Sequence, residues 1–153
     1  DTDFAVAFAK SQMGAGQKVP TSGKAFISVR DSDKPDIVDM ARHLVEAGFE
    51  ILATGGTQRY LVDNNVPATK INKVLEGRPH IVDAVKNGGV QLVINTTDGR
   101  KALSDSRDIR RSALLSKVPY YTTIPGAVAA VDGIIAYREG SVQVRALQEY
   151  FAA

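Results

Sequence analysis

Short apolar runs alternate with amphipathic stretches along most of this chain, and that alternation constrains the fold more than any other feature. Residues 24–30 and 50–53 are apolar runs of strand length, and residues 35–47 between them place Ile37, Met40 and Leu44 at helical spacing. Strands that alternate with helices are typical of a parallel sheet with helices on both faces. We therefore predict a three-layer α/β/α fold.

The remaining elements are predicted from the same two patterns. Further strands are expected at 68–72, 90–95 and 118–122, and further helices at 57–64, from 79 onward, and at 104–116, 125–138 and 142–151.

The first residues differ from the rest of the chain. Phe4, Phe8 and Met13 lie at near-helical spacing, and glycines and prolines then break the pattern. We expect residues 1–23 to be a leading helix and linker, with the main domain at 24–153. The chain opens on Asp1 rather than Met, which suggests a segment of a longer protein whose remainder would cover the apolar side of this helix.

Composition excludes several classes of protein. A chain of 153 residues is long enough for one conventional core, and without cysteine it has neither disulfides nor thiolate metal sites. We see no signal peptide and no apolar run of about 18 residues, so we expect a cytoplasmic protein that does not enter a membrane. The net charge is +2 and the basic residues are mostly interleaved with acidic ones, so nucleic acid is not an expected partner.

Familiar ligand signatures are weak or missing. Gly14-Ala15-Gly16 follows a helix and lacks a third glycine, so we interpret it as linker rather than as a dinucleotide-binding loop. There is no Walker A sequence. His43 and His80 have no convincing partner at metal-ligand spacing, so no metal site is predicted.

Polar side chains gather where the predicted strands end. In a parallel α/β sheet, ligands bind outside the carboxyl ends of the strands. Hydroxyl, amide and ammonium groups donate to oxygen, and the Thr54–Thr57 turn lets backbone N–H groups approach an anion at a helix N-terminus. Each residue alone is equally an ordinary cap, turn residue or surface lysine, but together they favour a phosphate site. The set is Ser28, Lys34, Thr54, Thr57, Lys73, Asn95 and Thr97.

A run of charges lies on or near the predicted helix 104–116. It includes Arg100-Lys101 and the stretch from Arg107 to Arg111. We interpret it mainly as a solvated face or a contact with another subunit. The alternative is direct contact with a ligand, chiefly through Asp105 and Ile109 near the start of the helix.

Several of these segments resemble a known family. Residues 8–16, 26–30, 48–57, 72–81, 93–97 and 106–114 are similar to the C-terminal allosteric domain of carbamoyl phosphate synthetase large subunits, and the resemblance covers essentially the whole chain. It implies the methylglyoxal-synthase-like fold, a five-stranded parallel sheet of order 3-2-1-4-5.

The resemblance also implies roles for individual residues. The pocket would bind nucleotide effectors, UMP as an inhibitor and, in some members, IMP as an activator. Asp108 stands where an apolar residue is common, which leaves the base preference open. The phosphate-binding positions fall on Lys34, Thr54, Thr57, Lys73, Asn95 and Thr97, those near ribose and base on Ser28, Asp105 and Ile109, and those at the ornithine boundary on Tyr120 and Thr122.

A regulatory role within a larger enzyme follows from the same resemblance. The parent enzyme makes carbamoyl phosphate for pyrimidine and arginine biosynthesis from bicarbonate, glutamine-derived ammonia and ATP, with Mg²⁺ or Mn²⁺. That chemistry would lie outside these residues, so we expect no catalytic residue and no cofactor in this chain. The implied partners are the rest of the large subunit, the glutaminase small subunit and further copies of the chain.

Two enzymes of the same fold are the alternatives. Methylglyoxal synthase has a similar Thr-Gly turn but abstracts a proton with an aspartate in a Gly-Pro-x-Gly-Gly-Asp stretch; residues 76–80 differ, and Asp83 is a weak substitute. IMP cyclohydrolase is similar at Ser28-Val29 and at the Thr54–Thr57 turn, but its Gly-Arg-Val-Lys-Thr-Leu-His-Pro stretch is missing.

Overall fold

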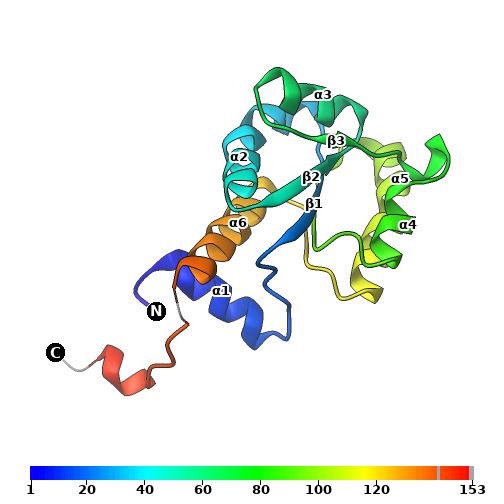
Figure 1. Cartoon of the computed structure of the whole chain (residues 1–153). Coiled ribbons are helices and arrows are strands. Elements are labelled where there is room, and N and C mark those ends of the chain that lie inside the picture. Colours follow the sequence, from blue (N-terminus) through cyan, green and yellow to red (C-terminus); the bar gives the residue numbers. More distant parts are fainter. Residues whose placement is uncertain (141, 152–153) are drawn as a thin grey trace.

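Five parallel strands form one sheet in this computed structural model, which describes residues 1–140 and 142–151 apart from the side chains of Lys101 and Asp105. The strands are β1 (Gly23–Ser28), β2 (Phe49–Ala53), β3 (Thr69–Lys70), β4 (Leu92–Asn95) and β5 (Tyr120–Tyr121). Their spatial order is β3-β2-β1-β4-β5, which places β1 in the middle (Figure 1). The predicted α/β fold and strand order are confirmed.

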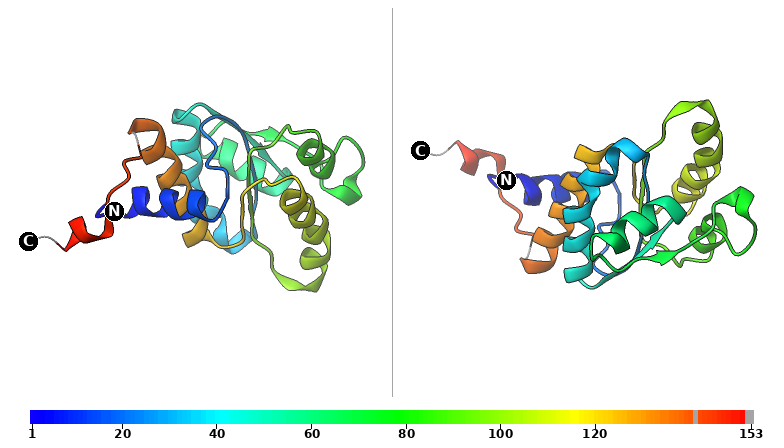
Figure 2. Two further views of the ribbon diagram at one scale, coloured as in Figure 1. Left: turned by 90° about the horizontal axis from the view of Figure 1, so that it is seen from below. Right: turned by 90° about the horizontal axis from the view of Figure 1, so that it is seen from above.

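Helices cover both faces of the sheet (Figure 2). One face carries α2 (Val38–Glu46) and α6 (Ile124–Glu139), and the other carries α4 (Ile81–Lys86) and α5 (Gly99–Leu115). The helix α3 (Gly55–Asp63) follows β2 directly, and the 3₁₀ helices η1 (Asp31–Ile37) and η2 (Val74–Glu76) follow β1 and β3. None of the helices in the described residues combines the length and the apolar character that crossing a membrane requires.

The core has two halves because successive strand residues point to opposite faces of the sheet. On the α4/α5 side, Phe26, Leu52 and Val93 pack with Ile81, Val85 and Ile109. On the α2/α6 side, neighbouring strand residues pack with Leu44, Val131 and Ile134; those strand residues are Ala25, Ile27, Ile51, Ala53, Leu92 and Ile94. The apolar runs in the sequence are therefore strands buried on both faces.

The strand register aligns the ends of the three central strands. Ile27 pairs with Ala53 on one side of β1, and Ser28 pairs with Asn95 on the other. The residues that follow β1, β2 and β4 therefore emerge at the same edge of the sheet, which we call the carboxyl edge.

The first helix packs against the body of the molecule. The helix α1 (Phe4–Gly14) confirms the helix predicted at 4–13, and it lies along α6. Gly133 of α6 allows the close approach, because a Cβ atom there would lie 3.2 Å from the Ala5 carbonyl oxygen and 3.4 Å from the Ala9 nitrogen. Phe8 lies against Tyr121, whereas Phe4 and Met13 are exposed.

One predicted helix is wrong. Residues 142–151 form an extended stretch that ends in a single 3₁₀ turn, η3 (Leu147–Tyr150), instead of a helix. The apolar side chains that suggested a helix remain in solvent, with Val144 100% and Phe151 80% exposed. A short helix in water is marginal without an apolar face to bury, which explains the difference.

Other predicted boundaries shift for identifiable reasons. The strands expected at 68–72 and 118–122 shrink to the two-residue edge strands β3 and β5, because each has a partner on one side only. The helix expected at 104–116 begins at Gly99, because Arg100, Ala102 and Leu103 are good helix formers. The helix expected at 35–47 begins as η1, which contains Pro35, and becomes α-helical only at Val38.

Candidate functional site

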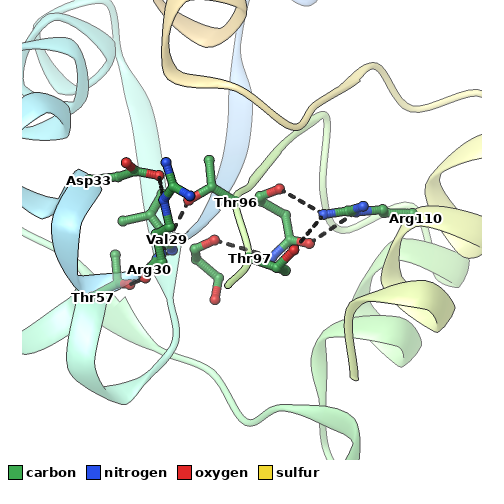
Figure 3. A network of polar contacts seen from close by, with 9 residues as sticks. Val29, Arg30, Asp33, Thr57, Thr96, Thr97 and Arg110 are labelled. Atoms are coloured by element: carbon green, nitrogen blue, oxygen red, sulfur yellow. Dashed lines mark hydrogen bonds and ion pairs between the residues drawn. The ribbon is translucent and has the colours of Figure 1, made fainter. Parts of the chain in front are cut away.

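Side chains tie the ends of the central strands together at the carboxyl edge. The hydroxyl oxygens of Ser28 and Thr54 lie 2.8 Å apart, and this contact joins β1 to the start of α3. The Thr57 hydroxyl accepts a hydrogen bond from the Val29 N–H at 3.2 Å (Figure 3). On the other side of β1, the Asn95 side-chain N–H donates to the Ser28 carbonyl oxygen at 3.1 Å. The edge is therefore a connected, buried polar network.

A cavity of about 350 Å³ opens beside this network. Its floor is formed by the ends of β1 and β4, and one wall is formed by α5. Five of the predicted site residues line it, namely Ser28, Lys73, Asn95, Thr97 and Ile109. Volumes of about 300–1,000 Å³ are typical of small-molecule sites, so the cavity is large enough for a ligand.

The N-terminus of α3 lies next to that network. The backbone N–H groups of Gly55, Gly56 and Thr57 donate to no acceptor in the described part of the chain, as expected for the first turn of a helix. The ammonium nitrogen of Lys34 approaches them, since it lies 3.1 Å from the position that a Cβ atom at Gly56 would take. Free N–H groups beside a cation are the donor set that an anion requires.

Lys34 already has an acidic partner. Its ammonium group lies 2.6 Å from the Asp31 carboxylate, and the hydrogen bond and charge attraction between them hold the pKa of Asp31 below its ordinary value of 3.8. The Lys34 side chain is only 16% exposed, whereas that of Asp31 is 96% exposed. The lysine is therefore held in place and the carboxylate can turn away into water.

Lys73 reaches the site from the opposite side. It directly precedes η2, and its backbone N–H donates to the Glu76 carboxylate at 2.8 Å. The residue is exposed and lines the cavity. Lys34 and Lys73 thus flank the carboxyl edge from two different connections.

The helix α5 supplies the far wall. Ile109 is buried and lines the cavity together with Ala102 and Ser106. Asp105 lies on the same helix, but its side chain is outside the described residues, so its predicted contact is not tested.

Tyr120 and Thr122 lie apart from the cavity. Both are exposed, Tyr120 in β5 and Thr122 just after it, and neither lines the cavity. Tyr121 between them is half-buried, which raises the pKa of its hydroxyl, and this hydroxyl donates to the Gln12 side-chain oxygen at 3.2 Å.

Several residues of the site were not predicted from the sequence. The Thr96 hydroxyl accepts from the Arg30 N–H at 3.2 Å, and the Arg30 guanidinium pairs with Asp33 at 2.8 Å (Figure 3). Thr96 lies between two predicted residues, so its position could have indicated it. Arg110 was interpreted as part of a charge run on a solvated face or at a contact with another subunit, and the solvated face is wrong for this residue, which is half-buried and bonded to β4.

No described group of three His, Asp or Glu side chains is arranged to hold a metal ion. His80 caps α4, where its Nδ1 accepts from the Asp83 N–H at 3.3 Å, and His43 is exposed on α2.

Comparisons of the sequence with known proteins identify its family. A family model described as the MGS-like domain matches residues 36–122. Similar curated proteins include the carbamoyl phosphate synthase large chains of Mesorhizobium japonicum, Rhizobium meliloti and Brucella suis. The first is 60% identical over 152 residues, the second 58% and the third 53% over 151 residues. Each alignment covers 99% of this chain but only 13% of the relative's length.

Proposed function

Because this chain belongs to the MGS-like domain family, we propose that it binds a nucleoside monophosphate at the carboxyl edge of its sheet and regulates a carbamoyl phosphate synthase large chain. The chain spans about 13% of the length of the relatives that carry this name. The catalytic steps of such an enzyme would belong to other parts of it. Residues 1–23 would be the connection from the preceding part and residues 24–153 the effector domain.

The observation that carries the proposal is the convergence of donors beside the cavity. The free N–H groups of α3 and the Lys34 ammonium form one anion-binding corner. Thr97, Asn95 and Lys73 line the neighbouring cavity. A phosphate group at this corner would receive charge-assisted hydrogen bonds, which are roughly twice as strong as neutral ones.

The rest of the nucleotide would extend along the cavity towards α5. Ser28 and Asp105 would lie near the ribose and Ile109 near the base, which would rest on an apolar surface. Thr54 and Thr57 would act mainly by shaping the turn, because both are buried and Thr57 already accepts from the Val29 N–H just after β1.

Regulation would follow from differential affinity. An effector shifts an enzyme between two states only if it binds them unequally, so UMP would inhibit and IMP would activate by favouring opposite states of the whole protein. ATP with Mg²⁺ or Mn²⁺ would bind outside this chain. The partners would be the rest of the large subunit, the glutaminase small subunit and further copies of the domain, all in the cytoplasm.

Tyr120 and Thr122 would contribute one wall of an ornithine site. Both are exposed at the edge strand β5, away from the cavity, as residues at a boundary between domains would be. One wall cannot enclose a ligand, so this chain alone should bind ornithine only weakly. Submillimolar ornithine affinity of the 153-residue chain would contradict this.

Catalysis by this chain is not part of the proposal. The carboxylate considered as a base, Asp83, lies 3.4 Å from His80 Nδ1 and 3.6 Å from the Arg78 guanidinium, and it does not line the cavity. A general base must reach the proton that it removes. Assays for methylglyoxal formation from dihydroxyacetone phosphate and for IMP cyclohydrolase activity test this directly, and turnover in either would overturn it.

Calorimetric titration of the chain with UMP, IMP, uridine and inorganic phosphate tests the proposed function. We expect the nucleotides to bind and uridine to bind much more weakly, because uridine lacks the group that the donors recognise. Equal affinity for UMP and uridine, or no nucleotide binding, would exclude the phosphate site.

A further inference from the structure

Arg110 reaches from α5 to the end of β4 (Figure 3). Its guanidinium donates to the Asn95 side-chain oxygen at 3.4 Å, to the Asn95 carbonyl oxygen at 3.3 Å and to the Thr97 hydroxyl at 3.4 Å. All of these contacts fall on two residues that line the cavity. Arg110 itself does not line it.

The three acceptors are all uncharged. Arg110 forms no ion pair with any side chain that the structure describes. A half-buried cation that has no carboxylate partner among the described side chains gives the end of β4 a positive potential. That potential polarises the groups that accept from it, because hydrogen bonds in a chain strengthen one another.

For Asn95, these contacts fix which end of the amide faces which neighbour. The oxygen accepts from Arg110 and the nitrogen donates to the Ser28 carbonyl oxygen, so a flip of the amide would lose both hydrogen bonds. An amide nitrogen carries two N–H donors, and the Ser28 bond uses one of them. The second N–H of the amide nitrogen remains available to donate to a ligand. The amide oxygen cannot take its place, because a flip of the amide would lose the hydrogen bonds to Arg110 and Ser28.

For Thr97, the contact fixes the role of the hydroxyl. A hydroxyl group has one hydrogen to donate and lone pairs that accept. Because its oxygen accepts from Arg110, its own hydrogen stays available for an acceptor in the cavity.

We infer that Arg110 is a positioning residue, which holds Asn95 and Thr97 so that both present hydrogen-bond donors to an anionic group bound in the cavity. The nature of that group, the phosphate of a nucleotide, rests on the proposed function. The orientation of the Asn95 amide rests on its hydrogen bonds to Arg110 and Ser28 alone.

The test compares substitutions at two neighbouring arginines. Arg110→Met keeps the apolar stem and removes every donor, and Arg110→Lys restores a cationic donor. Arg111→Met is the matched control, because Arg111 is exposed on the same helix and its substitution changes the net charge equally. Each variant is measured by melting temperature, by the NMR signals of the Asn95 side-chain amide without ligand, and by calorimetric titration with UMP.

We expect Arg110→Met to move the Asn95 amide signals and to weaken UMP binding roughly 10-fold, the loss that follows when about one well-made hydrogen bond disappears. Arg110→Lys should recover part of both, and Arg111→Met should leave the amide signals unchanged and the affinity within about twofold. Unchanged amide signals in Arg110→Met, or equal losses of affinity in the two Met variants, would overturn the inference.

The two proposals fail in different ways. If the wild-type chain binds no nucleotide, the proposed function fails while the amide signals still decide whether Arg110 orients Asn95. If Arg110→Met does not fold, Arg110→Lys gives the same decision: normal amide signals with normal UMP affinity support positioning by a cation, and displaced signals with unchanged affinity overturn it.

Discussion

The ammonium group of Lys34 and the carboxylate of Asp31 lie 2.6 Å apart on η1, beside the N-terminus of α3. A phosphate bound at that helix terminus would compete with Asp31 for the same ammonium group. Asp31 would also repel the phosphate, because a carboxylate is ionised at neutral pH and the pairing with Lys34 lowers the pKa of Asp31 further. The ion pair therefore opposes anion binding while it holds Lys34 in position.

Removing this competitor should strengthen binding. We predict that Asp31→Asn tightens UMP binding roughly two- to fivefold, in line with the small energies of exposed ion pairs. Asp36→Asn is the control, because Asp36 is an exposed acid of the same 3₁₀ helix and forms no ion pair with a described side chain. Calorimetry at two salt concentrations measures both. An equal gain in the two variants would show a general charge effect instead of competition for Lys34.

Removing the lysines should have the opposite effect. A charge-assisted hydrogen bond contributes about 1.5–3 kcal/mol, so Lys34→Ala and Lys73→Ala should each weaken UMP or IMP binding roughly 10- to 150-fold. The melting temperature should hardly change for Lys73, which is exposed. A solvated surface lysine would change affinity by less than about threefold. Unchanged affinity in both variants would exclude the proposed phosphate-binding site.

Alkaline pH should destabilise the chain through Tyr121. Burial raises its pKa above the ordinary value of 10.0, so its contribution to stability is complete below pH 10 and is lost as the pH rises through the higher pKa of the folded state. Tyr121→Phe should abolish this loss while costing about 0.5–1.5 kcal/mol at pH 8, since the hydrogen bond to Gln12 disappears. Urea unfolding between pH 8 and 11 measures both effects, with Tyr120→Phe as control. Parallel curves for wild type and Tyr121→Phe would contradict the prediction.

The contact between α1 and α6 should depend on Gly133. A valine there would collide with the backbone of α1, and we expect Gly133→Val to lower the free energy of unfolding by about 1–3 kcal/mol. The amides of α1 should then exchange with solvent faster than those of β1. Gly14→Val, at the end of α1, is the control because its Cβ would meet nothing within 4 Å. If α1 exchanges equally fast in wild type and Gly133→Val, it is not held by this contact.

The central part of the fold follows from the sequence because it depends on local patterns. Successive strand residues such as Phe26 and Ile27 are both apolar and point to opposite faces of the sheet. Only a sheet that is covered by helices on both faces buries both side chains. The lengths of the edge strands and the structure of the segment 142–151 could not be predicted, because both depend on which neighbours cover them. The apolar spacing of Val144, Leu147 and Phe151 is compatible with a helix, but no surface receives it.

The candidate site also has residues that the sequence predicts and others, such as Arg110, that it does not. Thr54 directly follows β2, and Asn95 and Thr97 lie at and just beyond the end of β4, so the topology alone brings them to one edge. Arg110 is different, because arginines in a charged helical stretch usually face solvent. Its spacing from Ser106 and Ala113, both buried on α5, is the one local signal that it points inward.

The hydrogen bonds at the carboxyl edge that join the end of β1 to β4 and to the first turn of α3 are made between the protein's own groups. These side chains therefore lose their rotational freedom during folding rather than on binding, and substitutions among them alter stability and affinity together. Ser32, Asp98 and Ala102 line the same cavity without belonging to that network. Selection can change ligand preference most freely at these three positions, so members of the family with different effectors should diverge there first.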